Sequence, residues 1–139
     1  TTGFAISLEE IPFAAPKTSA TLGRTQFRRP ILESAVVNAK AGCLYPNNAR
    51  MLVEARRNGF SNALVADAMG NVAETATANI FMARDGEVFT PAPNGTFLAG
   101  ITRARHITHL KDIRSTQLKY RISYNFSMKI SIMKVDFFS

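Results

Sequence analysis

The sequence predicts a mixed α/β (α+β) fold in which short strands form a meander and helices flank it. One observation is a clearly delimited helix after Pro46, and another is the uninterrupted apolar run at residues 63–66, which is typical of a buried strand. A third is the pair Asp85-Gly86 between two β-prone segments, which predicts a hairpin because both residues tolerate positive φ. A hydrophobic content of 46% over 139 residues is enough for a packed core.

The first 40 residues are expected to be mostly extended. Residues 3–11 alternate loosely between apolar and polar and predict a strand that ends at Pro12. Residues 12–23 are rich in Pro, Ala, Thr and Ser and lack periodicity, so we expect a linker between domains. An apolar group at residues 31–37 then leads to Lys40, which we expect at the end of an extended segment.

The middle of the chain predicts a helix followed by two strands. The helix begins at Pro46, where the missing N–H does no harm, and ends at Asn58-Gly59. A buried strand at residues 63–66 and a turn at residues 67–70 follow. The next strand is expected at residues 72–75.

The later part of the chain predicts a hairpin, a second helix and an irregular tail. The hairpin strands are expected at residues 79–83 and 87–90, and the helix from near Gly100 to about Leu110. Residues 115–139 contain no Gly or Pro and favour strands by propensity, without turns to connect them. No domain is predicted there.

Composition argues against several classes of protein. The chain has no apolar run long enough to cross a bilayer and no signal-peptide pattern at its start, so no membrane association is expected. Cys43 is the only cysteine, which excludes an internal disulfide and a multi-cysteine zinc site and favours a cytoplasmic location. More than half of the net charge of +7 lies in residues 108–139 and the charge of the rest is unremarkable, so nucleic-acid binding is not expected.

Four chemical groups appear in an order that a pyridoxal phosphate site requires. Lys40, flanked by alanines, suits a buried but accessible amine that holds an aldehyde. Tyr45 offers a phenol for the ring hydroxyl, and Glu74 a carboxylate that keeps the ring nitrogen protonated. Residues 95–102 place two glycines and the Thr102 hydroxyl before a helix start, where an anion can bind. Each group alone has an ordinary structural explanation.

Two other candidates are set aside. His106 and His109 lie three residues apart, but no carboxylate or cysteine joins them nearby, so no metal site is expected. Cys43 is expected to be a small core residue rather than a nucleophile.

Together the segments are similar in sequence and spacing to the class IV aminotransferases, the branched-chain aminotransferase family of fold-type IV pyridoxal phosphate enzymes. This resemblance implies part of a two-domain fold, mainly the first half of the large domain. The similar segments are Lys40-Ala41-Gly42-Cys43-Leu44-Tyr45, Gly70-Asn71-Val72-Ala73-Glu74, Asn79-Ile80-Phe81, Phe89-Thr90-Pro91 and Leu98-Ala99-Gly100-Ile101-Thr102-Arg103.

The resemblance implies an activity and its catalytic residue. Lys40 would be the Schiff-base lysine that takes the substrate α-proton and returns it to the cofactor carbon. The reaction would be transamination between branched-chain L-amino acids and 2-oxoglutarate, and the family's intact members are homodimers.

The resemblance also assigns residues to parts of the cofactor. Tyr45 would contact the ring hydroxyl and Glu74 the ring nitrogen. Leu98 would pack on the ring, and Ile101 and Thr102 would contact the phosphate.

Sister branches of the family use the same lysine and glutamate for other reactions. They are the D-amino acid aminotransferases and the aminodeoxychorismate lyases. The D-amino acid branch usually has an aliphatic residue where Tyr45 stands, so Tyr45 favours branched-chain L-amino acids.

The resemblance covers roughly residues 1–107 and implies a division of the chain. Residues 1–11 would end the small domain, residues 12–23 would be the linker, residues 24–107 would be a partial large domain, and residues 108–139 an unmatched basic tail. The family's phosphate-binding arginine and a later threonine-containing loop have no counterpart here. A catalytically inactive fragment and a basic interaction module are therefore the alternatives.

Overall fold

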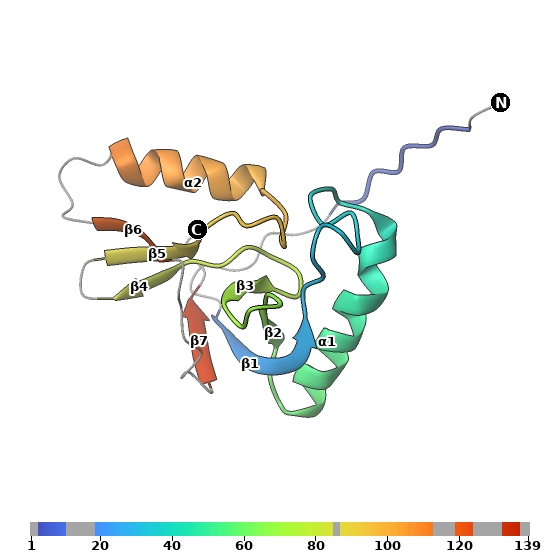
Figure 1. Ribbon diagram of the computed structural model, residues 1–139, viewed down its shortest axis with the longest axis horizontal. Coiled ribbons are helices and arrows are strands. Elements are labelled where there is room, and N and C mark those ends of the chain that lie inside the picture. The colour runs from blue at the N-terminus through green and yellow to red at the C-terminus, as the bar shows by residue number, and fades with distance from the viewer. Residues whose placement is uncertain (1–2, 11–18, 85–86, 113–118, 124–131, 137–139) are drawn as a thin grey trace.

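The computed structural model describes five parts of the chain, which are residues 3–10, 19–84, 87–112, 119–123 and 132–136. Within these parts, two β-sheets are accompanied by the helices α1 and α2 (Figure 1). The mixed α/β fold predicted from sequence is confirmed.

The larger sheet has the strand order β3-β2-β1-β7. Its strands are β1 (Ser19–Arg28), β2 (Asn62–Ala66), β3 (Val72–Thr75) and β7 (Ile132–Asp136). β1 is parallel to β2 and antiparallel to β7, and β2 is antiparallel to β3. Since α1 connects the parallel strands β1 and β2, these three elements form a βαβ unit.

The smaller sheet has the order β4-β5-β6. β4 (Met82–Arg84) and β5 (Glu87–Pro91) are antiparallel, and β6 (Lys119–Ser123) is parallel to β5. The two strands that flank Asp85-Gly86 are thus paired as predicted, while the turn itself lies outside the described residues.

The helix α1 spans Tyr45–Arg57 and follows a short 3-10 helix, η1 (Gly42–Leu44). Pro46 lies in its first turn, where the missing N–H has no intrahelical acceptor to lose. Gly59, with φ of 81°, follows the C-cap Asn58 and ends the helix. The predicted helix after Pro46 is confirmed.

The core lies on both faces of β2. Ala63 and Val65 pack with Met51 and Ala55 of α1, and Ala76 completes this buried cluster. On the other face, Leu64 forms a second buried cluster with Leu22 and Ile80. A strand covered on both faces has no exposed positions to fill with polar residues, which explains the continuous apolar run at residues 63–66.

The helix α2 (Ile101–Asp112) is held against β5 by a buried arginine. The Nε atom of Arg103 donates to the Oγ1 atom of Thr90 over 3.3 Å, and its Nη2 atom donates to the carbonyl oxygen of Pro91 over 2.7 Å. Its guanidinium carbon also lies 5.8 Å from the centre of the Phe97 ring. Arg103 therefore fixes where the first turn of α2 lies.

Several sequence expectations near the N-terminus are wrong. Residues 3–10 form no strand within the described chain, and the side chains of Phe4, Ile6 and Leu8 are exposed, because no strand lies beside them to pair with. Residues 19–23, expected to belong to a linker, form the first half of β1.

The approach to Lys40 also differs from the prediction. Residues 31–40 form turns instead of an extended segment, closed by local backbone hydrogen bonds such as that from Ser34 N to Ile31 O at 3.0 Å. Ile31 and Val36 are exposed while Val37 is buried, so this apolar group is not a strand with one face in the core.

Two segments of the basic tail are strands, one in each sheet. β6 pairs with β5 and β7 pairs with β1, so residues 119–123 and 132–136 extend the two sheets at an edge, as their β-propensity allows. No helix in the described part of the chain has the length and apolar character to cross a membrane.

Candidate active site

The centre of the candidate site is a buried ion pair between Glu74 and Arg29. Glu74 lies in β3, and Arg29 follows the last residue of β1. The Nη2 atom of Arg29 lies 2.7 Å from the Oε1 atom of Glu74, and the two side chains are only 4% and 8% exposed. The structure therefore holds the carboxylate predicted for the ring nitrogen in a fixed position away from water.

Burial and the neighbouring arginine act in opposite directions on Glu74. The net pKa of Glu74 is raised from 4.5 to about 7, because burial raises it by more than the positive charge of Arg29 lowers it. The Arg29 charge therefore favours the ionised carboxylate that a protonated ring nitrogen needs as its partner.

Arg29 uses its other two nitrogens to reach different parts of the chain. Its Nη1 atom donates to the Oδ1 atom of Asn48 over 2.6 Å, and its Nε atom donates to the carbonyl oxygen of Thr96 over 3.3 Å. Asn48 lies in the first turn of α1, which begins at Tyr45. Arg29 thus links the Tyr45 end of α1, the carboxylate of Glu74 and the loop before α2.

Sequence reasoning missed Arg29. Arg28 and Arg29 are adjacent and chemically identical, yet Arg28 is exposed and Arg29 is buried. The signal that was present is the period of two, since Thr25 is buried and Phe27 packs against the core cluster that contains residues of α1. Arg29 continues this inward series by one more step.

Asn79 holds the second oxygen of the carboxylate. Its Nδ2 atom donates to the Oε2 atom of Glu74 over 3.2 Å and to the carbonyl oxygen of Leu98 over 3.0 Å. Both carboxylate oxygens of Glu74 are therefore occupied, one by Arg29 and one by Asn79. Glu74 and Leu98, two of the predicted site residues, are brought together through this amide.

The predicted phosphate-binding residues lie where α2 begins. Leu98 is half-buried, whereas Ile101 and Thr102 are exposed in the first turn of α2. The first hydrogen bond of the helix runs from the backbone N–H of Ala104 to the Gly100 carbonyl over 3.0 Å. The backbone N–H groups that precede Ala104 in the first turn therefore have no acceptor within the helix. Such N–H groups suit a phosphate. In Figure 1 the loop that leads into α2 runs toward the side on which the chain enters α1.

Lys40 and Tyr45 lie on the surface around α1. Tyr45 is the first residue of α1 and is 55% exposed. Lys40 lies in the turn before η1 and is exposed, not buried as the flanking alanines suggested, and it forms no hydrogen bond or ion pair with any described residue. Its amine is therefore accessible to a ligand, while the ion-pair network around Arg29 does not include it.

One smaller expectation can also be judged. Cys43 is exposed, so the expectation of a core position was wrong, because η1 turns it away from the packed face that Leu44 occupies. His106 and His109 are exposed, and the described residues contain no cluster of three or more metal-ligating side chains.

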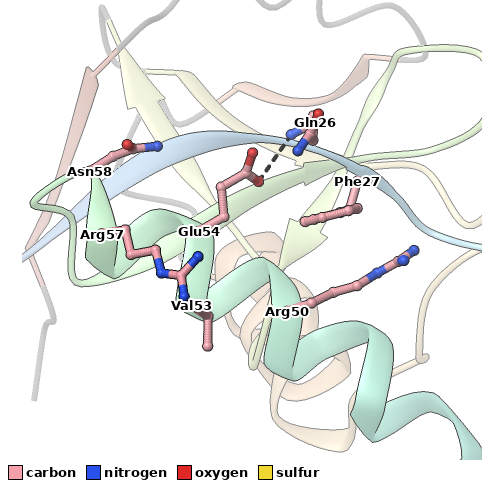
Figure 2. A pocket seen from close by; sticks show the side chains of 7 residues that line it. All are labelled: Gln26, Phe27, Arg50, Val53, Glu54, Arg57 and Asn58. Carbon is pink, nitrogen blue, oxygen red and sulfur yellow. Dashed lines mark hydrogen bonds between the residues drawn. The ribbon is translucent and has the colours of Figure 1, made fainter.

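A separate hollow of about 450 Å³ lies between β1 and α1 (Figure 2). Two of its charged groups, those of Glu54 and Arg50, are engaged with the protein itself. The Glu54 carboxylate accepts hydrogen bonds from the Thr25 hydroxyl and from the Gln26 N–H, and the Arg50 guanidinium lies 4.2 Å from the centre of the Phe27 ring. None of the predicted site residues lines this hollow; its lining residues are Gln26, Phe27, Arg50, Val53, Glu54, Arg57 and Asn58.

The residues present fit the chemistry of pyridoxal phosphate. A buried carboxylate with both oxygens held by donors matches a ring nitrogen, and the start of α2 matches a phosphate. The exposed amine of Lys40 matches an aldehyde, and the exposed phenol of Tyr45 a ring hydroxyl.

Comparisons with known proteins agree with this chemistry. The family "Amino-transferase class IV" matches residues 1–124, so the match continues past residue 107 into β6. A probable branched-chain-amino-acid aminotransferase of Rickettsia felis is 33% identical over 106 residues, which are 73% of this chain and 36% of that relative. This chain thus spans about a third of that relative's length.

Solved structures show the same similarity. An aminotransferase from Brucella abortus, bound to the cofactor PLP, aligns with a TM-score of 0.76 at 60% identity, covering 82% of this chain and 39% of that one. The T.th. branched-chain amino acid aminotransferase, complexed with N-(5'-phosphopyridoxyl)-L-glutamate, aligns with a TM-score of 0.66 at 31% identity, covering 73% and 34%. From its sequence, its fold and its buried carboxylate, the chain belongs to the class IV aminotransferases.

Proposed function

We propose that this chain carries a pyridoxal phosphate site for transamination of branched-chain L-amino acids with 2-oxoglutarate, with Lys40 as the catalytic lysine. The observation that carries the proposal is Glu74, a buried carboxylate whose two oxygens are held by Arg29 and Asn79. Burial of a carboxylate is costly, and such an arrangement suits a positively charged partner such as a protonated pyridine nitrogen.

Each part of the cofactor has an assigned residue in this proposal. Glu74 holds the ring nitrogen, Tyr45 the ring hydroxyl and Lys40 the aldehyde. Leu98 packs on the ring, and the phosphate is contacted by Ile101 and Thr102. When bound, pyridoxal phosphate supplies an electron sink for the charge that develops on the substrate α-carbon.

The accessible amine of Lys40 has a second task in this proposal. With the cofactor bound, its Nζ atom would accept the proton from the substrate α-carbon and carry it during the transfer. The Lys40 side chain is exposed and forms no hydrogen bond or ion pair with another described residue, so no contact within the described chain competes for its amine.

The substrate class rests on the relatives. The chain resembles branched-chain aminotransferases, and another structure of the T.th. enzyme carries 4-methylvaleric acid, an acid with a leucine-like branched chain. The phosphopyridoxyl-glutamate complex of the same enzyme supports glutamate and 2-oxoglutarate as the second pair. Tyr45 favours this assignment over D-amino acids, and aminodeoxychorismate cleavage is the remaining family alternative.

Capture of the cofactor is the first part of the proposal to test. The purified 139-residue chain is mixed with pyridoxal phosphate, any imine is trapped with borohydride, and the modified lysine is located by peptide mass. We expect label on Lys40, and no label there in the Lys40→Ala variant, whereas Lys17→Ala keeps it. Label spread over many lysines, or none, would overturn cofactor binding at this site.

Turnover is a separate part, because the relatives are about three times longer than the matched region. Formation of glutamate from 2-oxoglutarate is measured with L-leucine and, as the comparison, with D-alanine. Preference for L-leucine supports the branched-chain assignment. Label on Lys40 without turnover of either amino acid would show that this chain binds the cofactor but is not a complete enzyme. From the resemblance to the family, we also propose that the protein acts as a homodimer.

A further inference from the structure

We propose that Asn79 is a positioning residue that couples the loop for the phosphate to the carboxylate for the ring nitrogen, so that the phosphate contacts are held at a fixed position relative to that carboxylate. This inference rests on the proposed function, since it needs a ligand that carries both a ring nitrogen and a phosphate.

The hydrogen bonds of Asn79 join two segments that are distant in sequence. Its Nδ2 atom carries two protons, and the two acceptors are the Oε2 atom of Glu74 at 3.2 Å and the carbonyl oxygen of Leu98 at 3.0 Å. Both N–H protons are therefore used. One is donated to an acceptor on β3 and the other to an acceptor on the loop before α2.

The Leu98 carbonyl is held from two sides. Besides the Asn79 amide, it accepts the backbone N–H of Gly100 over 2.9 Å. The hydrogen bond from Gly100 to Leu98 closes a turn that lies directly before Ile101, where α2 begins. The orientation of the peptide that leads into the proposed phosphate contacts is thereby tied to the side chain of Asn79.

Gly100 leaves the space that the side-chain amide of Asn79 occupies. A Cβ atom at Gly100 would overlap the Oδ1 atom of Asn79, and its next neighbours, the Cγ atom of Asn79 and the Cβ atom of Arg103, lie 3.4 and 3.7 Å away. Gly100 is not among the described glycines with positive φ, so what it provides is space for Asn79 and not an unusual backbone conformation. A side chain here would push the amide away from its two acceptors.

The coupling has a consequence that a purely structural asparagine would not have. Without the Asn79 amide, Glu74 keeps Arg29 and stays available to the ring nitrogen. The loop still binds Arg29 at Thr96, but it loses its link to Glu74 at Leu98, next to the start of α2. The affinity gained from the phosphate group should therefore fall more than the affinity for the ring.

The test compares two ligands on the full chain. Dissociation constants of pyridoxal phosphate and of pyridoxal, which lacks the phosphate, are measured by equilibrium titration. The Kd of pyridoxal divided by the Kd of pyridoxal phosphate reports the contribution of the phosphate to affinity. In Asn79→Ala we expect this ratio to fall roughly fivefold to tenfold, the effect of one lost hydrogen bond, with little change for pyridoxal. The matched control is Asn62→Ala, which removes an amide that donates to the Thr77 hydroxyl over 2.8 Å, and it should leave the ratio unchanged.

A second variant keeps the inference testable if Asn79→Ala folds poorly. Gly100→Ala should lower the ratio in the same way, because its methyl group displaces the amide. In the double variant Asn79→Ala/Gly100→Ala the overlap no longer exists, so the loss should be no larger than in Asn79→Ala alone.

The outcomes separate this inference from the proposed function. Unchanged ratios in both single variants, or fully additive losses in the double variant, would overturn the coupling while cofactor binding stands. A wild-type chain that binds neither pyridoxal phosphate nor pyridoxal would overturn the proposed function, and this inference with it.

Discussion

Arg29 and Glu74 are joined by an ion pair, Nη2 to Oε1 at 2.7 Å, although β2 lies between the two strands that carry them to this point. The backbone N–H of Arg29 donates to the carbonyl of Ala66, the last residue of β2, over 2.9 Å, which holds the end of β1 in register. Because the remaining Arg29 nitrogens bind α1 and the loop before α2, this pair is the point at which β3, α1 and that loop are joined.

Replacing Arg29 by methionine should strongly destabilise the fold. The change leaves a buried carboxylate without its charged partner, and breaking a buried pair in this way costs about 3 to 5 kcal/mol in the free energy of unfolding. Urea unfolding at a pH of about 8, above the pKa of Glu74, measures the loss. The matched control is Arg24→Met, an exposed arginine on the same strand, which should change the free energy by less than about 0.5 kcal/mol. Equal losses in both variants would contradict the assigned role of Arg29.

The pKa of Glu74 predicts a pH dependence of stability in the ligand-free chain. Since the pKa is about 7 when folded and 4.5 in its ordinary state, the folded chain retains a proton that the unfolded chain has released between these values. The protonated group thus favours folding at low pH, and this contribution is lost as the pH rises from about 4.5 to about 7. It amounts to about 3 kcal/mol.

The measurement is the free energy of unfolding of wild type minus that of Glu74→Gln across this pH range. Subtraction removes the other titrating groups, and the difference should fall as the pH rises. A difference that is flat or rises with pH would show that burial does not raise the pKa of Glu74.

Replacing Tyr45 by phenylalanine should affect the ligand and not the fold. The side chain is 55% exposed, so loss of the hydroxyl should change the free energy of unfolding by less than about 0.5 kcal/mol. Affinity for pyridoxal phosphate should fall roughly threefold to tenfold, because one hydrogen bond to the ring hydroxyl is lost. Titration with an analogue that lacks this hydroxyl is the control, and an equal loss for the analogue would contradict the assignment.

Adding a methyl group at Gly23 should destabilise the βαβ unit. A Cβ atom there would overlap the ring of Phe60, which packs against the core cluster beneath α1. Gly23→Ala should therefore cost about 1 to 3 kcal/mol. Gly42→Ala is the control, since nothing lies within 4 Å of a Cβ at that position and its φ is not positive, and thermal unfolding should separate the two variants clearly.

Elements that depend on neighbouring residues were predictable. Pro46 and Asn58-Gly59 delimit α1, and the apolar run at residues 63–66 predicts β2, because helix ends and buried strands have local signatures. The motif around Glu74 indicated the family for a related reason, since its chemistry requires particular residue types at particular spacings. The individual roles of the predicted site residues stay predictions.

Exposure and pairing were not predictable from local pattern. Residues 3–11 have the alternation of a strand, but a strand also needs a partner, and none lies beside residues 3–10 in the described chain. Lys40 and Cys43 have small apolar neighbours in sequence and are nevertheless exposed, because burial is decided by elements that pack from elsewhere.

The sequence by itself determined the α/β class, the main helices and strands, and the family to which the chain belongs. Only the tertiary structure decided which of two adjacent arginines pairs with Glu74 and that the amide of Asn79 joins Glu74 to Leu98. The physical reason is that secondary structure and motif chemistry follow from short-range spacing. A buried charge, in contrast, takes its partner from whichever segment the fold brings within hydrogen-bonding distance.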